Sequence, residues 1–185
     1  MRLRRRDFLS SAIALATLAK PALGAEREVI EARVELALQR LYRDVPGAAE
    51  LRDRAVGLLV MPAVVKGGFL LGGTYGEGAL RLAEDGFQET AGYYSVAGVS
   101  LGLQAGVQET SHVLFFLTDR SLERFRTSDG WEIGADAEAT FPDTTANIGL
   151  TSTEFRKPIV ALVFAGSGLL VGASLEGAKY SRIVR

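Results

Sequence analysis

Apolar and polar positions divide the chain into a helical part and a longer part made of strands. From residue 26 to 45 apolar residues recur every three or four positions, which predicts an amphipathic helix that Pro46 and Gly47 end. A second, short helix is expected over residues 48–55. Strand-like stretches dominate after it, and this order predicts an α+β domain. The apolar stripe of the first helix consists of Ile30, Val34, Ala37, Leu38 and Leu41.

The second part of the chain reads as a series of short strands with one more helix. A turn at Glu84-Asp85-Gly86 joins two of the strands. A helix near 119–128, capped by Thr118 or Asp119, carries Leu122 and Phe125 on one side. Residues 131–139 alternate between apolar and acidic or glycine positions, which predicts a half-buried strand. The other expected strands are 56–61 (ended by Pro62), 69–82, 87–97, 112–118, 159–165 and 169–175, with a polar loop over 143–153.

Glycine is concentrated in one part of this strand region. Eleven of the 21 glycines fall between residues 64 and 106, interleaved with valine, leucine, phenylalanine and tyrosine. Strand formers with glycines at fixed pleats indicate a sheet that bends sharply or that another element approaches closely. The sequence therefore predicts N-terminal helices packed on a strongly curved, mostly antiparallel, glycine-rich sheet, barrel- or sandwich-like, within one domain over residues 25–185.

The first 24 residues have the pattern of a cleavable export signal. A basic start, a short apolar stretch and small residues near position 24 are typical of such segments. Arg5, Arg6, Phe8 and Leu9 match the twin-arginine signature, which predicts a periplasmic protein, with an ordinary secretory signal or an N-terminal anchor as the alternatives. Residues 25–185 then carry 16 basic and 21 acidic side chains, a net charge of −5. That balance argues against nucleic acid as a partner, because nucleic-acid binding depends on neutralising phosphates.

Residues able to perform catalysis or hold a metal are few. The chain has no cysteine, and His112 is its single histidine, so neither a metal nor another cofactor is expected. Gly98-Val99-Ser100-Leu101-Gly102 matches the G-x-S-x-G motif of serine hydrolases. Apolar residues alternate through residues 97–107, which predicts a strand, whereas the motif requires a sharp turn into a helix. A hydrolase using Ser100 therefore remains only an alternative to a non-enzymatic protein.

Several ordered blocks resemble the SYLF family, also called Ysc84-like. They are VVKGGF from Val64, GGTYGEG from Gly72, GYYS from Gly92, GLQAG from Gly102, Phe125-Arg126, Gly130-Trp131 and SLEG from Ser174. The resemblance covers nearly all of residues 27–185 and implies a lipid-binding domain without catalysis. Eukaryotic members bind phosphoinositides and act with actin, whereas bacterial members are exported. Actin is therefore not expected as a partner in a periplasm.

The resemblance and the residue types together give a set of candidate lipid contacts. Lys66 beside Gly67 and Gly68 is expected to meet a phosphate with its ammonium group and loop amides. Tyr75, Tyr93 and Tyr94 are expected at a lipid–water interface, with core packing against glycine as the alternative. Arg33 and Arg40 lie on the polar face of the first helix, whose apolar stripe favours packing on the sheet. An envelope structural or protein-interaction module without lipid is the alternative function.

Overall fold

The computed structural model describes residues 26–136, 139, 157–165, 168–169, 175 and 177–185; at 68–71, 100–106 and 168–169 it describes the backbone only. The expected export signal and the loop over 143–153 lie outside these residues. The elements in chain order are α1 (Arg27–Asp44), α2 (Ala48–Arg54), β1 (Gly57–Leu82), the 3-10 turn η1 (Ala83–Asp85), β2 (Thr90–Phe116), α3 (Asp119–Thr127), β3 (Trp131–Glu132), β4 (Ile159–Ala165), β5 (Gly168–Leu169) and β6 (Ala178–Ile183).

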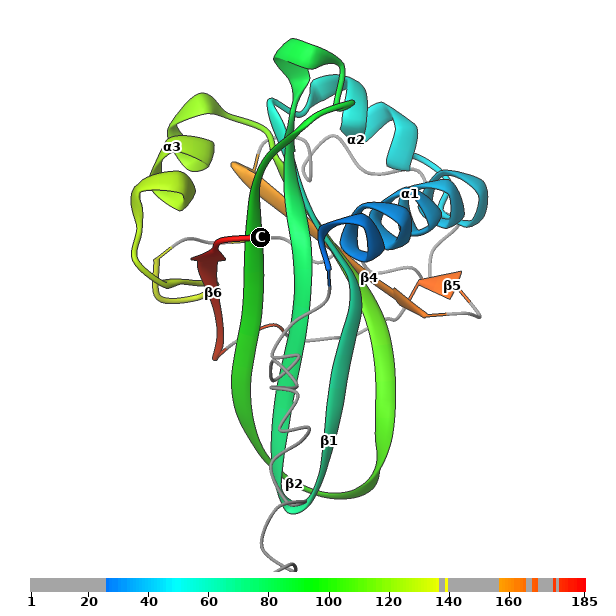
Figure 1. Cartoon of the computed structure of the whole chain (residues 1–185), viewed down its shortest axis with the longest axis vertical. Helices are drawn as coiled ribbons and strands as arrows, with labels where there is room; N and C mark the ends of the chain where they lie inside the picture. Colours follow the sequence, from blue (N-terminus) through cyan, green and yellow to red (C-terminus); the bar gives the residue numbers. More distant parts are fainter. Residues whose placement is uncertain (1–25, 137–138, 140–156, 166–167, 170–174, 176) are drawn as a thin grey trace, which may run out of the picture.

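Two long strands, β1 and β2, form the centre of the molecule. They pair antiparallel from Gly57 opposite Phe116 to Arg81 opposite Thr90. The turn between them places Gly86 in the left-handed region, at φ 69°, as the turn signal in the sequence predicts. Both strands bend in the middle. The pair therefore forms a ribbon that projects from the end of the molecule where the helices lie, which we call the head, then folds over and returns to it (Figure 1).

The prediction of several separate strands over this region is therefore wrong. Stretches 56–61 and 69–82 are parts of β1, and stretches 87–97 and 112–118 are largely parts of β2. The pairing register shifts between Met61 and Val64, and this bulge holds Pro62 without breaking the strand, since a bulge needs no ladder hydrogen bond from that residue. The Pro62 carbonyl oxygen accepts a hydrogen bond from Ser111 Oγ at 2.7 Å.

Two glycines of β1, Gly76 and Gly78, lie where the two limbs of this strand (its segments before and after the bend) cross in contact. A Cβ atom placed on Gly78 would lie 1.9 Å from the carbonyl oxygen of Val60, and one on Gly76 would lie 2.8 Å from that of Ala63. Backbone therefore packs directly on backbone, at a separation that only glycine allows. The element that approaches the bare face of this strand is the first limb of the same strand.

The bends also decide the order of the sheet. The strands run β3-β6-β2-β4-β5, and β1 pairs with β2. Strand β6 pairs with the first limb of β2, around Val96, whereas β4 pairs with its second limb, around Leu114. The sheet is consequently strongly curved and antiparallel, and together with the helices it confirms the predicted α+β class.

Helices cover both faces of the curved sheet. On one face, α1 and α2 bury their apolar residues against Val60, Val113 and Phe115, and the predicted α1 stripe is buried throughout. On the other face, α3 packs Leu122 and Phe125 on the sheet. Thr118 caps α3 by accepting a hydrogen bond from the Ser121 amide at 3.2 Å, as expected. Phe116, Phe125, Trp131 and Tyr180 form an aromatic cluster there.

Two differences from the expected elements lie in the last third of the chain. The strand expected over 131–139 ends at Glu132, because Gly134 adopts φ 95° and Asp136 Oδ2 accepts a hydrogen bond from the Glu132 amide at 2.7 Å. This local turn competes with the strand pattern. Strand β6 was not predicted, although Ala178 and Tyr180 are buried and alternate with exposed Lys179. Strand β4 is confirmed; the strand expected over 169–175 lies mostly outside the described residues.

Gly78 is the position where a side chain should be least tolerated. Substitution Gly78→Ala forces the two limbs of β1 apart and should lower the free energy of unfolding by about 2–3 kcal/mol. Gly73→Ala is the matched control in the same strand, because nothing lies within 4 Å of its Cβ position; its effect should stay within about 0.5 kcal/mol. Urea unfolding of both variants checks this, and equal losses would contradict the crossing.

Candidate functional site

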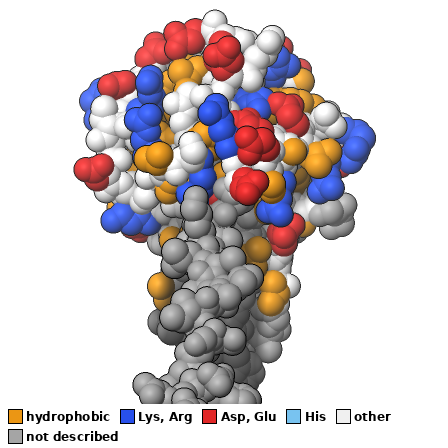
Figure 2. Space-filling view, viewed as in Figure 1, with side chains coloured by type: hydrophobic (Ala, Val, Ile, Leu, Met, Phe, Trp, Pro, Cys, Tyr) orange, Lys and Arg blue, Asp and Glu red, His pale blue; other side chains and the backbone are white. Residues whose placement is uncertain are grey.

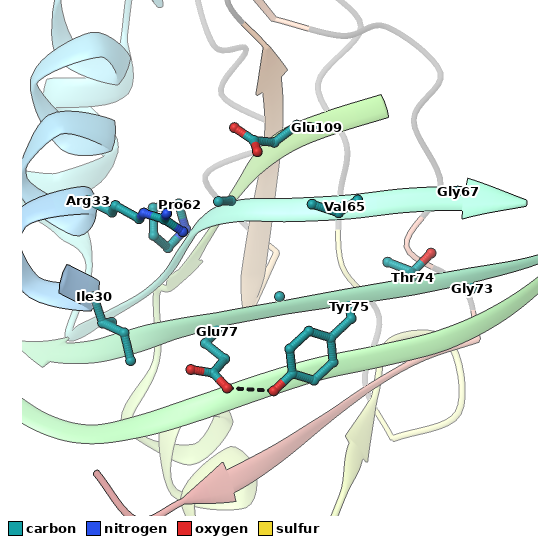
Figure 3. Close-up of a pocket in the computed structure, with 12 residues that line it drawn as sticks. Ile30, Arg33, Pro62, Val65, Gly67, Gly73, Thr74, Tyr75, Glu77 and Glu109 are labelled. Atoms are coloured by element: carbon teal, nitrogen blue, oxygen red, sulfur yellow. Dashed lines mark hydrogen bonds between the residues drawn. The ribbon is translucent and has the colours of Figure 1, made fainter. Parts of the chain in front are cut away.

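A pocket of about 470 Å³ opens between the two limbs of β1 and the N-terminal half of α1 (Figure 3). Strand residues form most of its wall, and α1 contributes Ile30 and Arg33. The pocket lies where the limbs of β1 diverge beyond their crossing at Gly76 and Gly78. Its lining consists of Ile30, Arg33, Pro62, Ala63, Val65, Gly67, Gly73, Thr74, Tyr75, Gly76, Glu77 and Glu109.

The floor of this pocket contains a carboxylate whose negative charge is balanced by a neighbouring arginine. Glu77 is 8% exposed and accepts a hydrogen bond from the Tyr75 hydroxyl at 2.5 Å. The guanidinium of Arg185 forms an ion pair with the same carboxylate and donates from Nε to Oε2 at 3.2 Å. The hydrogen bond to Glu77, with burial, raises the pKa of Tyr75. These contacts fix the ring of Tyr75 at the pocket wall and balance the buried charge of Glu77.

The rim of the pocket carries one cation and one anion that are not compensated in this way. Arg33 projects from α1 and Glu109 from β2, and both are exposed. Within the part of the chain that the structure describes, neither side chain forms a hydrogen bond or an ion pair. Their charges are therefore available to a ligand, at the modest desolvation cost of surface groups.

An exposed apolar surface continues from the pocket along the projecting ribbon. Val99 and Val107 are 74% and 79% exposed, and the register places them opposite Gly73 and Gly67, on the face that lines the pocket. Val65 and Tyr75 are also exposed on this face. In Figure 2 a few hydrophobic side chains are visible below a head that is rich in charged groups. Helix α1 does not extend this far, so the face is uncovered among the described residues.

The structure brings together three of the predicted lipid contacts: Arg33, Gly67 and Tyr75 line the pocket. Lys66 is exposed, but strand alternation places it on the opposite face from Val65 and Gly67. Residues 66–68 are paired in β1 rather than forming a loop, so the amide cradle expected beside Lys66 is absent. The pairing also places Gly68 within the strand. Arg40 is exposed on α1 and does not line the pocket.

Tyr93 and Tyr94 are buried on opposite faces of β2, as in the core-packing alternative. The Tyr93 hydroxyl donates a hydrogen bond to Glu31 on α1 at 2.5 Å. The ring of Tyr94 packs on Phe125 of α3, with 4.7 Å between ring centroids. Neither ring is placed to enter a lipid–water interface in this structure.

A buried arginine that was not predicted from the sequence attaches α1 to the sheet. Arg81 donates to Glu31 at 3.0 Å, to Glu35 at 2.5 Å and to the Phe87 carbonyl oxygen at 3.2 Å. Burial raises the pKa of Glu31, but hydrogen bonds from Tyr93 and Arg81 outweigh it and lower this pKa overall. The signal in the sequence was a pair of glutamates four residues apart on one helix face, together with one arginine in an apolar strand.

The hydrolase motif does not form a nucleophile elbow. Ser100 lies within β2, opposite Gly72, and the strand continues through it. His112 lies twelve residues after Ser100 on the same strand. Its buried ring forms a hydrogen bond with Thr110 Oγ1 at 2.9 Å. Among the described residues no cluster of histidine or acidic side chains could hold a metal ion. Nor does that part of the chain contain a helix with the length and apolar character needed to span a membrane.

The family comparison matches the second part of the chain. A family model described as Ysc84, Las17-binding protein actin regulator, matches residues 97–183. Residues 97–183 are therefore similar to this family. The resemblance to SYLF proteins is thereby confirmed over a little under half of the chain, from β2 to β6. The matched region includes Val99, Val107 and Glu109, whereas Arg33 and Tyr75 precede it. No match was found among curated proteins.

His112 should make the fold sensitive to mild acid. Burial lowers its pKa from 6.5 to about 4, so between these values the unfolded chain binds a proton that the folded chain excludes. The free energy of unfolding should therefore fall by about 2–3 kcal/mol from this residue as the pH drops from 7.5 to 4.5. Urea unfolding across this range measures the effect. In His112→Gln this component should disappear, and an unchanged pH slope would contradict the assignment.

Proposed function

We propose that this chain is a non-enzymatic lipid-binding protein that acts at a membrane surface. The observation that supports this function is the continuity between the pocket and the exposed apolar face of the ribbon. Large exposed apolar patches commonly mark interaction sites, and a membrane is one partner that such a patch fits. The Ysc84 family, whose model matches residues 97–183, is a family of binding domains, which agrees with a role in binding rather than catalysis.

The ribbon suits a membrane surface because of how it projects. It extends from a head whose surface carries many charged groups of both signs (Figure 2). Burial of an exposed valine in an apolar environment stabilises a complex by about 1.5 kcal/mol or more. The net charge of −5 over residues 25–185 does not favour bulk attraction to anionic lipid. Apolar contact through the ribbon is therefore proposed as the main source of affinity.

Replacing the exposed valines of the ribbon should weaken membrane binding. Residues 25–185, which contain every described element, should co-sediment with vesicles of phosphatidylethanolamine and phosphatidylglycerol. The double variant Val99→Ser/Val107→Ser should bind them at least about 10-fold more weakly, because two apolar contacts are lost. Leu36→Ser is the matched control, since Leu36 is exposed on α1 away from the ribbon, and its affinity should change less than twofold.

The vesicle experiment also separates lipid binding from protein binding. If the unaltered protein binds no vesicles, the proposed function is wrong. Retention of one stoichiometric protein partner, lost in the same double valine variant, would then assign the apolar face to an envelope interaction module. Equal vesicle binding by the double variant and the unaltered protein would remove the ribbon as the contact surface.

We also propose the periplasm as the site of action, on the twin-arginine pattern at the start of the sequence. Substitution of both Arg5 and Arg6 by lysine should leave the precursor in the cytoplasm, because that pathway requires the arginine pair. Cell fractionation of a bacterial host detects the protein and its processed form. Normal export of the lysine variant would indicate a different route.

A further inference from the structure

The pocket carries charges of both signs at its rim, and this limits the ligands that it fits. Arg33 and Glu109 line the same cavity from different elements (Figure 3). Neither is engaged by another described side chain. A purely anionic headgroup would be attracted by Arg33 but repelled by Glu109, and a purely cationic ligand would meet the reverse. A zwitterion is complementary to both.

Glu77, the second acidic residue that lines the pocket, is less available to a ligand cation than Glu109. Its carboxylate is buried and already holds Arg185 and the Tyr75 hydroxyl. These contacts keep the Tyr75 ring in place at the pocket wall, and that residue is 51% exposed. The face of a fixed tyrosine ring attracts an ammonium group within about 6 Å. Tyr75 and Glu109 are therefore the groups on the pocket wall that suit an ammonium ion.

We infer that the pocket selects an amine-bearing zwitterionic phospholipid headgroup, with its phosphate at Arg33 and its primary ammonium between Glu109 and Tyr75. A guanidinium is well suited to a phosphate because it donates two parallel hydrogen bonds. A primary ammonium donates hydrogen bonds to a carboxylate, which a quaternary ammonium cannot do. The acyl chains leave the pocket along Val65 and Val107 on the apolar face. This inference rests on the proposed lipid-binding function.

Two sets of vesicles test the selectivity. One contains phosphatidylethanolamine and the other phosphatidylcholine, each with the same fraction of phosphatidylglycerol. The unaltered protein should bind the phosphatidylethanolamine vesicles at least about 5-fold more tightly. Soluble glycerophosphoethanolamine should compete with binding, whereas glycerophosphocholine should not. The soluble competitors separate headgroup recognition from an effect of phosphatidylethanolamine on bilayer packing.

Two pairs of variants assign the charges to residues. Glu109→Gln should abolish the preference for phosphatidylethanolamine while keeping the binding to phosphatidylcholine vesicles, and Glu84→Gln, at the exposed turn outside the pocket, should keep the preference. Arg33→Gln should weaken binding to both vesicle types about 3- to 10-fold. Its matched control is Arg40→Gln, on the same helix but outside the pocket, which should bind as the unaltered protein does.

The results distinguish this inference from the proposed function. Equal binding to both vesicle types, or a preference that persists in Glu109→Gln, overturns the headgroup assignment and leaves lipid binding intact. Binding that depends on phosphatidylglycerol alone also overturns it. Failure to bind any vesicle overturns the lipid-binding function itself.

Discussion

The contact of β1 with itself is the constraint on which the rest of the structure depends. Where Gly78 meets the backbone of Val60, the two limbs of the strand touch without side chains between them. This contact lets a hairpin of two long strands fold over instead of extending flat. The folded ribbon then gives the sheet its curvature, exposes an apolar face beyond α1 and leaves a pocket where the limbs diverge. A side chain at the crossing would separate the limbs and change all three features.

Charged groups near this crossing include ion pairs that hold the fold together and, among the described residues, rim charges that have no partner. Arg81 is buried between Glu31 and Glu35 and holds α1 on the sheet. Arg185 compensates the carboxylate of Glu77 beneath the pocket. Buried charges that lose a partner are costly, so these residues are committed to the fold. Among the described residues, the exposed charges of the pocket rim have no partner, and the headgroup selectivity that we propose rests on them.

Local elements could be predicted well because local chemistry decides them. The stripe of α1, the Thr118 cap of α3, the turn at Gly86 and the strand β4 all follow from spacing, capping or left-handed geometry. The lengths of β1 and β2 could not be predicted, because Pro62 and the glycines read as strand ends. In the folded chain a bulge and a bend accommodate them, and these depend on the partner strand.

The sequence by itself determined the fold class, the likeness to Ysc84 proteins and the absence of an elbow at Ser100, since periodicity and motif order decide these. The candidate site required the tertiary structure. Tyr75 and Tyr93 are the same residue type in similar glycine-rich surroundings, yet one lines an open pocket and the other is buried under α1. Arg33 and Glu109 lie 76 positions apart in the chain. Only the fold of the ribbon brings such residues to one cavity, because side-chain burial and proximity depend on how the limbs cross rather than on local spacing.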